Sequence, residues 1–215
     1  MKKHLTVCVF IGFFAPIFAC AAGPATATAT AAANAVGSGT ASEVQAWHAL
    51  RGGAVVLFRH ALAPGGGDPP GMRVGDCKTQ RNLSDEGRDQ ARRMGERLRQ
   101  ERVPVQAVFS SQWCRAKETA ALMALKNANS QAIATAEVPA FNSLFAAPER
   151  QPAQTAQALK VLAKHKGPGA LVVATHQTAI TALTGVVPAS GEGVVLHIET
   201  DNAGPRVVVV GRINP

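Results

Sequence analysis

The stretch GAVVLFRHALAPGGGDPP, residues 53–70, joins an apolar run to a loop rich in glycine and proline. The run Ala54–Phe58 has the continuous apolar character of a strand that is buried on both faces. Arg59 and His60 follow directly, at the point where this strand leaves the core. Two such side chains can simply mark the point where a strand reaches the surface, or they can belong to a functional site. The rest of the sequence distinguishes these two interpretations.

Apolar runs and amphipathic segments alternate after this stretch. We expect helices near Ser84–Leu98, Trp113–Lys126, Gln154–His165 and Gln177–Leu183, and strands near Ala54–Arg59, Ala107–Ser110, Ala134–Val138, Ala170–Thr175, Val194–Ile198 and Arg206–Gly211. The last two strands, joined by the turn sequence TDNAGP, are expected to form an antiparallel pair at a sheet edge. This alternation predicts an α/β fold, a three-layer α/β/α sandwich with a mostly parallel sheet.

The first of these helices has a clear start signal and one apolar face. Ser84 is a favourable N-cap, and Asp85 and Glu86 place negative charge at the positive end of the helix dipole. The apolar face repeats at three- and four-residue steps through Gly87, Ala91, Met94, Gly95 and Leu98.

The N-terminal part of the sequence predicts export. Residues 1–21 have the charged start, apolar centre and small-residue end of a signal peptide, and the apolar run is too short to span a bilayer. Residues 22–42 are rich in Ala and Thr and predict a flexible linker, which leaves residues 43–215 as one folded domain. Cleavage at Ala19-Cys20-Ala21 predicts a periplasmic or otherwise exported protein. Ile17–Cys20 instead resembles a lipoprotein box, in which case a lipid on Cys20 would attach the protein to a membrane.

The charge of the chain favours anionic small molecules over nucleic acid. The formal net charge is +8, or +6 without Lys2 and Lys3. The sequence lacks a run of five basic residues and any tyrosine, so the basic-aromatic pattern of single-strand binders is missing. We therefore expect a phosphorylated small molecule or envelope glycan as partner, and no nucleic acid.

Two cysteines remain in the predicted domain, Cys77 and Cys114. In an oxidising compartment this pair predicts a disulfide. The alternative, a metal site, lacks any close-spaced pair of ligands, and we expect no metal.

Three predicted strands carry unusual residues at their carboxyl ends. Arg59 and His60 end the first, SSQWCRAKETA with Arg115 follows the second, and His176 ends the third; Arg81 precedes the first predicted helix. Because ligands of open α/β sheets bind beyond these strand ends, the groups are expected to converge. Arginine forks bind phosphate oxygens, and a neutral imidazole attacks phosphorus. Each residue alone is better explained as structural; their joint placement predicts an anion pocket.

Four segments in this order resemble the histidine phosphatase superfamily, of the phosphoglycerate-mutase-like branch 1. They are FRHA, RNLSDEGRDQA, SSQWCRAKETA and VVATHQTAITALTG. Within that family the sequence looks most similar to small exported members resembling lipopolysaccharide core heptose-phosphate phosphatases. The resemblance implies that His60 is the nucleophile, that Arg59, Arg81 and Arg115 clamp the phosphoryl oxygens, that His176 contacts the same group, and that no cofactor is needed.

The sequence departs from the family pattern at two kinds of position. Ala61 stands where the family has glycine after the first histidine. The proton donor is also missing: Ser143 stands where mutase-type members have Glu, and Gln177 where acid-phosphatase members have Asp. Glu149 is the candidate for the general acid that we carry forward, with Glu192 as the alternative.

The sequence thus predicts an exported, metal-independent phosphatase that hydrolyses a phosphomonoester, such as an envelope sugar phosphate, through a phosphohistidine. The alternatives are a phosphohistidine-protein phosphatase, which the missing acid favours, and a non-catalytic phosphate-binding envelope module. We also expect the Cys77–Cys114 disulfide to hold the loop after His60 beside the pocket.

Overall fold

The computed structural model of this protein describes residues 41–214. The predicted signal peptide and the predicted linker up to residue 40 lie outside these residues. The helices are α1 (Ala41–Arg51), α2 (Asp85–Gln100), α3 (Cys114–Leu122), α4 (Gln151–Leu162) and α5 (Gln177–Thr184), with short 3₁₀ helices η1 (Cys77–Thr79), η2 (Pro139–Phe141) and η3 (Pro148–Arg150). The strands are β1 (Val55–Arg59), β2 (Val105–Ser110), β3 (Thr135–Glu137), β4 (Ala170–Thr175), β5 (Gly193–Asp201) and β6 (Gly204–Ile213).

The strands form one six-stranded mixed sheet in the order β3-β2-β4-β1-β5-β6. The pairs β3·β2, β2·β4 and β4·β1 are parallel, whereas β5 pairs antiparallel with both β1 and β6. The α/β prediction with a mostly parallel sheet and a terminal antiparallel pair is therefore confirmed. Strands β1 and β4 lie side by side at the centre, which explains why both sequences are almost continuously apolar.

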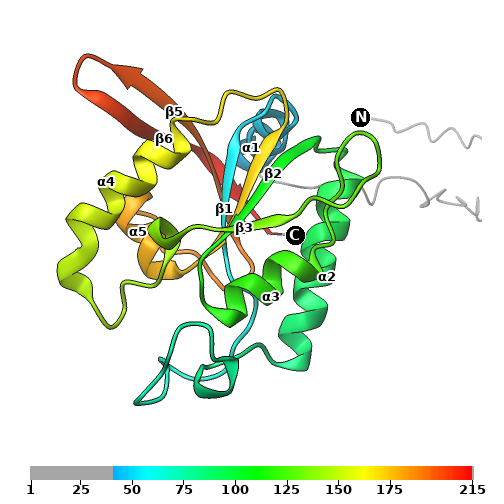
Figure 1. The fold of residues 1–215 in the computed structure, drawn as a ribbon. Coiled ribbons are helices and arrows are strands. Elements are labelled where there is room, and N and C mark those ends of the chain that lie inside the picture. The colour runs from blue at the N-terminus through cyan, green and yellow to red at the C-terminus, as the bar shows by residue number, and fades with distance from the viewer. Residues whose placement is uncertain (1–40, 215) are drawn as a thin grey trace, which may run out of the picture. The chain divides into compact units, whose positions relative to one another are not determined.

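Helices cover both faces of this sheet (Figure 1). On one face, α1, α2 and α3 bury side chains such as Leu50, Met94 and Ala120 against Val56, Phe58 and other residues of that face. On the other face, α4 and α5 bury Leu162 and Ile180 against Leu57 and Val173. Alternate residues of β1 point to opposite cores, as the two-residue period of a strand requires. The result is the predicted three-layer sandwich.

Three features of the helices differ from the sequence prediction. Helix α4 lies three residues earlier than predicted, at Gln151–Leu162 rather than Gln154–His165. Helix α1 was not predicted; it begins at Ala41, inside the predicted linker, and buries Ala46, Trp47 and Leu50. Helix α3 ends at Leu122 rather than at Lys126 because the backbone of Ala124 is left-handed, with φ of 47°. A left-handed residue cannot continue an α-helix.

Helix α2 begins and packs as its sequence predicts. The Ser84 hydroxyl accepts a hydrogen bond from the Gly87 amide at 3.0 Å, so it caps the helix. Glycine is required at Gly95, because a Cβ atom there would lie 2.0 Å from the Met123 carbonyl oxygen. A Cβ at Gly87 would lie equally close to the Leu62 carbonyl oxygen, which brings the start of α2 against the loop after β1.

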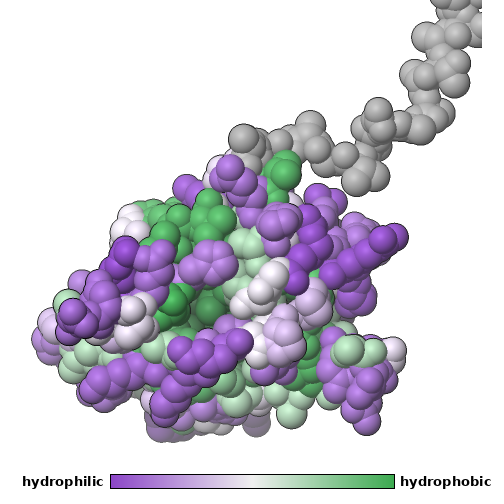
Figure 2. Space-filling model, turned by 90° about the horizontal axis from the view of Figure 1, so that it is seen from above, coloured by the Kyte–Doolittle hydropathy of each residue, from purple (hydrophilic) through white to green (hydrophobic). Residues whose placement is uncertain are grey.

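Figure 2 shows the domain from the end at which α1 lies, with a green apolar patch bordered by purple hydrophilic side chains. The carboxyl ends of the parallel strands point to the opposite end, the lower edge in Figure 1, where the segment between β1 and α2 lies. Within residues 41–214, none of the helices has the length and apolar character needed to cross a bilayer.

Candidate active site

The sheet register brings three strand exits together. Arg59 of β1 pairs with Thr175 of β4, and Ala174 of β4 pairs with Ser110 of β2. The residues that follow these strands therefore leave the sheet at the same edge, and His60 and His176 meet with their ring centroids 5.4 Å apart. They line a pocket of about 220 Å³ together with Arg59, Arg81 and Arg115. We call it the basic pocket; it contains all five residues that the sequence assigned to phosphate chemistry.

His60 is held in one tautomer by the backbone of the next residue, Ala61. Its Nδ1 lies 2.8 Å from the Ala61 carbonyl oxygen, which can only accept, so Nδ1 carries the proton. Nε2 then has the lone pair, and it accepts a hydrogen bond from Arg115 Nε at 3.2 Å. The His60 amide donates to the Thr175 carbonyl oxygen at 2.8 Å, which fixes the exit of β1 against β4. The ring therefore presents an unprotonated nitrogen to the guanidinium of Arg115.

The site accommodates alanine where the family has glycine. Ala61 is fully buried, its amide donates to Thr119 Oγ1 at 3.0 Å, and its carbonyl oxygen binds His60. Thr119 in turn donates to the Arg115 carbonyl oxygen at 2.7 Å. Helix α3 thus supports the backbone of the nucleophile position as well as contributing Arg115.

Burial keeps both histidines neutral. Burial, and less strongly the charges of Arg115, Arg81 and Arg59, lowers the pKa of His60 to about 3, against an opposing hydrogen bond to Ala61. Burial and the neighbouring His60 and arginines also hold the pKa of His176 well below its ordinary value. A neutral imidazole is the form with a free electron pair, so His60 is chemically competent as a nucleophile at neutral pH.

His176 is the N-cap residue of α5 and lies beside Ser111 and Trp113. Its Nε2 is 2.7 Å from Ser111 Oγ, and its ring contacts the Trp113 ring edge to face with centroids 5.6 Å apart. Its Nδ1 has no hydrogen-bond partner among the described residues, although the side chain is only 3% exposed. A buried ring nitrogen without a hydrogen-bond partner lowers the stability of the fold unless a bound ligand supplies the missing hydrogen bond.

Two arginines also leave donors unused. Arg59 donates through Nη1 to the Pro188 carbonyl oxygen at 3.0 Å, and Arg81 donates through Nη1 to the Ala63 carbonyl oxygen. Within residues 41–214, the buried Nε of each arginine has no partner. Burial lowers the pKa of both guanidinium groups from an ordinary value that is far above neutral. Together with His176 Nδ1, these unpaired nitrogens form an incomplete hydrogen-bonding set, and the two arginine donors in it fit an anion.

Asp68, in the loop after β1, is a pocket residue that the sequence analysis missed. Its carboxylate accepts from Arg115 Nη1 at 2.6 Å and Nη2 at 3.1 Å, from Trp113 Nε1 at 2.9 Å and from the Arg81 amide at 3.1 Å. Burial acts to raise the pKa of Asp68, but the hydrogen bonds from Arg115 and Trp113 and the Arg115 charge outweigh it and lower that pKa. The sequence signal was an acidic residue within GGGDPPG. The direction of its side chain depends on the conformation of this loop, which the sequence does not reveal.

The carboxylates carried forward from the sequence do not line the pocket. Glu149 lies exposed in η3, where Pro148 starts a separate turn before α4. Glu192 is buried but forms an ion pair with Arg212 and accepts from the Ala189 amide at 2.7 Å. Neither residue is therefore retained as the proton donor. Ser143 and Gln177 do line the pocket, so the two positions where relatives carry an acid are present with neutral side chains.

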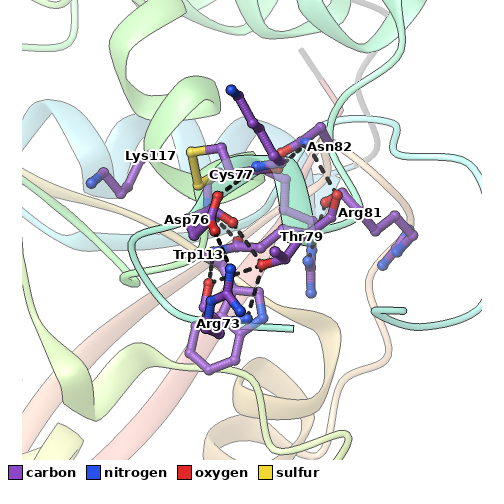
Figure 3. The surroundings of a disulfide bond; sticks show 12 residues. Arg73, Asp76, Cys77, Thr79, Arg81, Asn82, Trp113 and Lys117 are labelled. Atoms are coloured by element: carbon purple, nitrogen blue, oxygen red, sulfur yellow. Dashed lines mark hydrogen bonds and ion pairs between the residues drawn. A yellow bond between two sulfur atoms is a disulfide. The ribbon is translucent and has the colours of Figure 1, made fainter. Parts of the chain in front are cut away.

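The predicted disulfide between Cys77 and Cys114 is present, with the Cα atoms 5.7 Å apart (Figure 3). It joins η1 to the first residue of α3, which directly precedes Arg115. A hydrogen bond ties the same two segments together, because the Cys114 amide donates to Gln80 Oε1 at 2.9 Å. Within the loop, Asn82 Nδ2 donates to the Cys77 carbonyl oxygen at 2.7 Å. The loop that carries Asp68 and Arg81 is thereby attached to the helix that carries Arg115.

Replacing both Cys77 and Cys114 by alanine is expected to lower the free energy of unfolding by about 4 kcal/mol, the chain-entropy value for this loop. The sequence separation is 37 residues. Urea unfolding of the variant and the wild type, each with and without reductant, measures the effect. The wild type in reductant should match the variant, whereas the variant should not respond. Equal stability of all four samples would contradict a structural role for the bond.

Residues 55–138 match the sequence model of the histidine phosphatase superfamily (branch 1). This region covers β1 to β3 and includes His60, Arg81 and Arg115 but not His176. No curated protein matches the chain. Within residues 41–214, no group of three or more His, Cys, Asp or Glu side chains is arranged to hold a metal ion.

Solved structures with the same fold include two phosphatases. The protein histidine phosphatase SixA, solved with tungstate, is 16% identical, with a TM-score of 0.50 over 75% of this chain and 97% of that one. A mycobacterial glucosyl-3-phosphoglycerate phosphatase, solved with VO₃, is 16% identical, with a TM-score of 0.51 over 73% of this chain and 96% of that one. At this identity the likeness concerns the fold.

The matched segment carries the first histidine and all three arginines of the pocket, and the end of β4 places the second histidine against them. Residues 55–138 are thus similar to the histidine phosphatase superfamily, branch 1, and the described domain shares the fold of solved phosphatases.

Proposed function

We propose that this protein is an exported, metal-independent phosphatase that hydrolyses a sugar phosphomonoester through a phosphohistidine at His60. The observation that carries the proposal is the state of His60: a neutral ring whose lone-pair nitrogen, Nε2, lies 3.2 Å from Arg115 Nε. Unused donors of Arg59 and Arg81 and the unpaired Nδ1 of His176 surround the same pocket. A nucleophile and an anion-binding set in one pocket are the requirements for phosphoryl transfer to nitrogen.

The chemistry divides into two displacements at phosphorus. In the first, His60 Nε2 forms a bond to phosphorus while the ester P–O bond breaks, and the alcohol leaves with a proton. In the second, water attacks the phosphohistidine and the electron pair of the P–N bond returns to Nε2. The arginines neutralise charge on the transferring group in both steps, which is where fixed donors contribute most.

A second hollow supports the choice of substrate. This hollow, of about 340 Å³, shares Phe145, Gln177 and Thr178 with the basic pocket. No charged residue lines it, and its rim exposes Phe145 by 65% and Val187 by 58%. A leaving group that extends from the bound phosphoryl group would enter it. We call it the leaving-group hollow.

Neutral hydrogen-bonding groups stand beside the exposed ring. The side-chain amides of Gln151 and Gln177 make no hydrogen bond among the described residues, and the Thr178 hydroxyl accepts from the Leu144 amide at 3.0 Å. A ring such as Phe145 offers an apolar face, and the amides offer donors and acceptors. An uncharged ring bearing several hydroxyl groups, as in a sugar phosphate, uses both kinds of contact.

The experiment compares a hexose phosphate with acetyl phosphate, whose leaving group is too small to fill the leaving-group hollow. Wild-type turnover in EDTA is expected with both, and Phe145→Ala should lower kcat/KM about 10-fold for the hexose phosphate only. Val74→Ala removes another exposed apolar side chain, away from the hollow, and should change neither value. An equal loss for both substrates would contradict the substrate assignment. Saturable phosphate binding without any turnover would instead indicate a binding module.

A further inference from the structure

Among the described residues that line the basic pocket, Asp68 carries the only carboxyl group. Its side chain is 16% exposed, so it is mostly shielded yet open to the pocket. Ser143 and Gln177 also line this pocket, but their hydroxyl and amide groups are too weakly acidic to serve as general acids. If an alcohol is expelled in this pocket, Asp68 is the group with the chemistry to protonate it.

One guanidinium connects Asp68 to the nucleophile. Arg115 donates through Nε to His60 Nε2 at 3.2 Å, and through Nη1 and Nη2 to the two carboxylate oxygens of Asp68 at 2.6 and 3.1 Å. Arg115 is only 2% exposed, so its position is fixed by these contacts. A phosphoryl group at His60 Nε2 therefore lies at the same guanidinium that holds the Asp68 carboxylate.

Two anions at one guanidinium compete for its charge. A phosphoryl group that binds there weakens the hold of Arg115 on Asp68 and adds negative charge beside it. Both changes favour the protonated carboxyl group. The substrate can supply the proton, because a phosphomonoester has a second ionisation near pH 6 and binds in part as its monoanion.

We propose that Asp68 transfers the proton in both halves of the reaction, an inference that rests on the phosphatase activity proposed above. As the N–P bond forms at His60 Nε2 and the P–O bond breaks, the departing oxygen takes the proton of the Asp68 carboxyl group. Asp68 is then a carboxylate. As water attacks phosphorus and the P–N electron pair returns to Nε2, Asp68 takes the proton that the water loses. Inorganic phosphate, neutral His60 and protonated Asp68 result.

The test measures how the effect of Asp68→Asn depends on the leaving group. A hexose 6-phosphate expels a basic alkoxide that needs a proton, whereas 4-nitrophenyl phosphate expels a stable phenolate. The variant should lose about 10²- to 10³-fold in kcat/KM for the hexose phosphate, the usual size of general-acid catalysis, and less than about 5-fold for the aryl ester. With the aryl ester, slow attack by water should produce a burst of one phenolate per enzyme and an accumulated phosphohistidine.

Asp76→Asn is the matched control, because Asp76 lies in the same loop and pairs with Arg73 at 2.7 Å but does not line the pocket. This variant should keep the wild-type rates with both esters. Thermal unfolding of both variants checks that the loop remains folded. An Asp68→Asn loss that is equal for the two esters would overturn the proposal and leave Asp68 as a residue that positions Arg115. A wild type that forms no phosphohistidine would overturn the proposed function as well.

Discussion

Replacing His60 by asparagine is expected to lower kcat/KM for an aryl phosphate by at least about 10⁴-fold, because the variant has no group to take the phosphoryl group. The asparagine side chain is smaller than the ring but polar and planar, and its amide can still donate to the Ala61 carbonyl oxygen that His60 Nδ1 contacts at 2.8 Å. The loss should therefore come from the missing nucleophile. Phosphate release in EDTA, together with alkaline trapping of the labelled protein, measures both turnover and the phosphohistidine.

His165→Asn is the matched control for this result. His165 contacts the Gly53 carbonyl oxygen at 3.0 Å and does not line the basic pocket. It should keep the wild-type rate and the label. If His60→Asn also kept its label, the phosphoryl group would reside on another residue, and the assignment of His60 would be wrong.

The same variant should be less sensitive to acid. His60 stays neutral in the folded protein, with its pKa lowered to about 3, but titrates near 6.5 when unfolded. The unfolded chain therefore binds more protons below the ordinary pKa, and stability falls as the pH falls. Between about pH 7 and about pH 5, the protonation of this histidine in the unfolded chain alone lowers the free energy of unfolding by about 2 kcal/mol. Asp68 titrates below its ordinary 3.8, outside this window.

Urea unfolding at the two pH values should give the wild type a larger loss of stability than His60→Asn. His176 is also held neutral, so some dependence on pH remains in the variant. Equal losses in the two proteins would mean that His60 is already protonated in the folded state. Its lone pair would then not be free for attack, which would weaken the phosphohistidine proposal from an independent direction.

The strands and their exits were predictable because periodicity and burial decide them. The apolar runs of β1 and β4 required neighbours on both faces, and the ends of parallel strands meet at one edge, so His60 and His176 were correctly brought together. Asp68 was not predictable in this way. Its direction depends on a glycine-rich loop and on the N–H donors of Trp113 and Arg115, which lie 45 and 47 residues further along the chain. Such contacts leave no periodic signal.

Helix α1 escaped prediction for a related reason. Its sequence continues directly from an Ala- and Thr-rich stretch, in which the start signal, Thr40 followed three residues later by Glu43, is hard to distinguish from the preceding repeats. What makes it a helix is tertiary contact, since Ala46, Trp47 and Leu50 are buried in the same core as Val56 and Ile213. Arg97 adds a cation–π contact over Trp47 at 5.5 Å. Packing on the sheet, which the local sequence does not encode, outweighs the weak local signal.

Replacing Arg115 by methionine is expected to lower kcat/KM by about 10³-fold or more and the free energy of unfolding by about 1–3 kcal/mol. The activity falls because the charge beside His60 Nε2 is lost. The stability falls because Asp68, 16% exposed, keeps its carboxylate but loses the partner that holds both oxygens. A partly buried charge that loses its partner costs more than the pair contributed.

A double variant separates these two effects. In Arg115→Met/Asp68→Asn the unpaired carboxylate is gone, so most of the lost stability should return, while activity should stay low because the pocket still lacks its central cation. The coupling energy from the four proteins, measured by urea unfolding, should therefore be large and favourable to the pair. If the double variant were no more stable than Arg115→Met, the loss would come from packing of the arginine side chain. The ion pair with Arg115 would then not determine the protonation of Asp68. The proposal that a phosphoryl group protonates Asp68 by competing for the Arg115 guanidinium would have no basis.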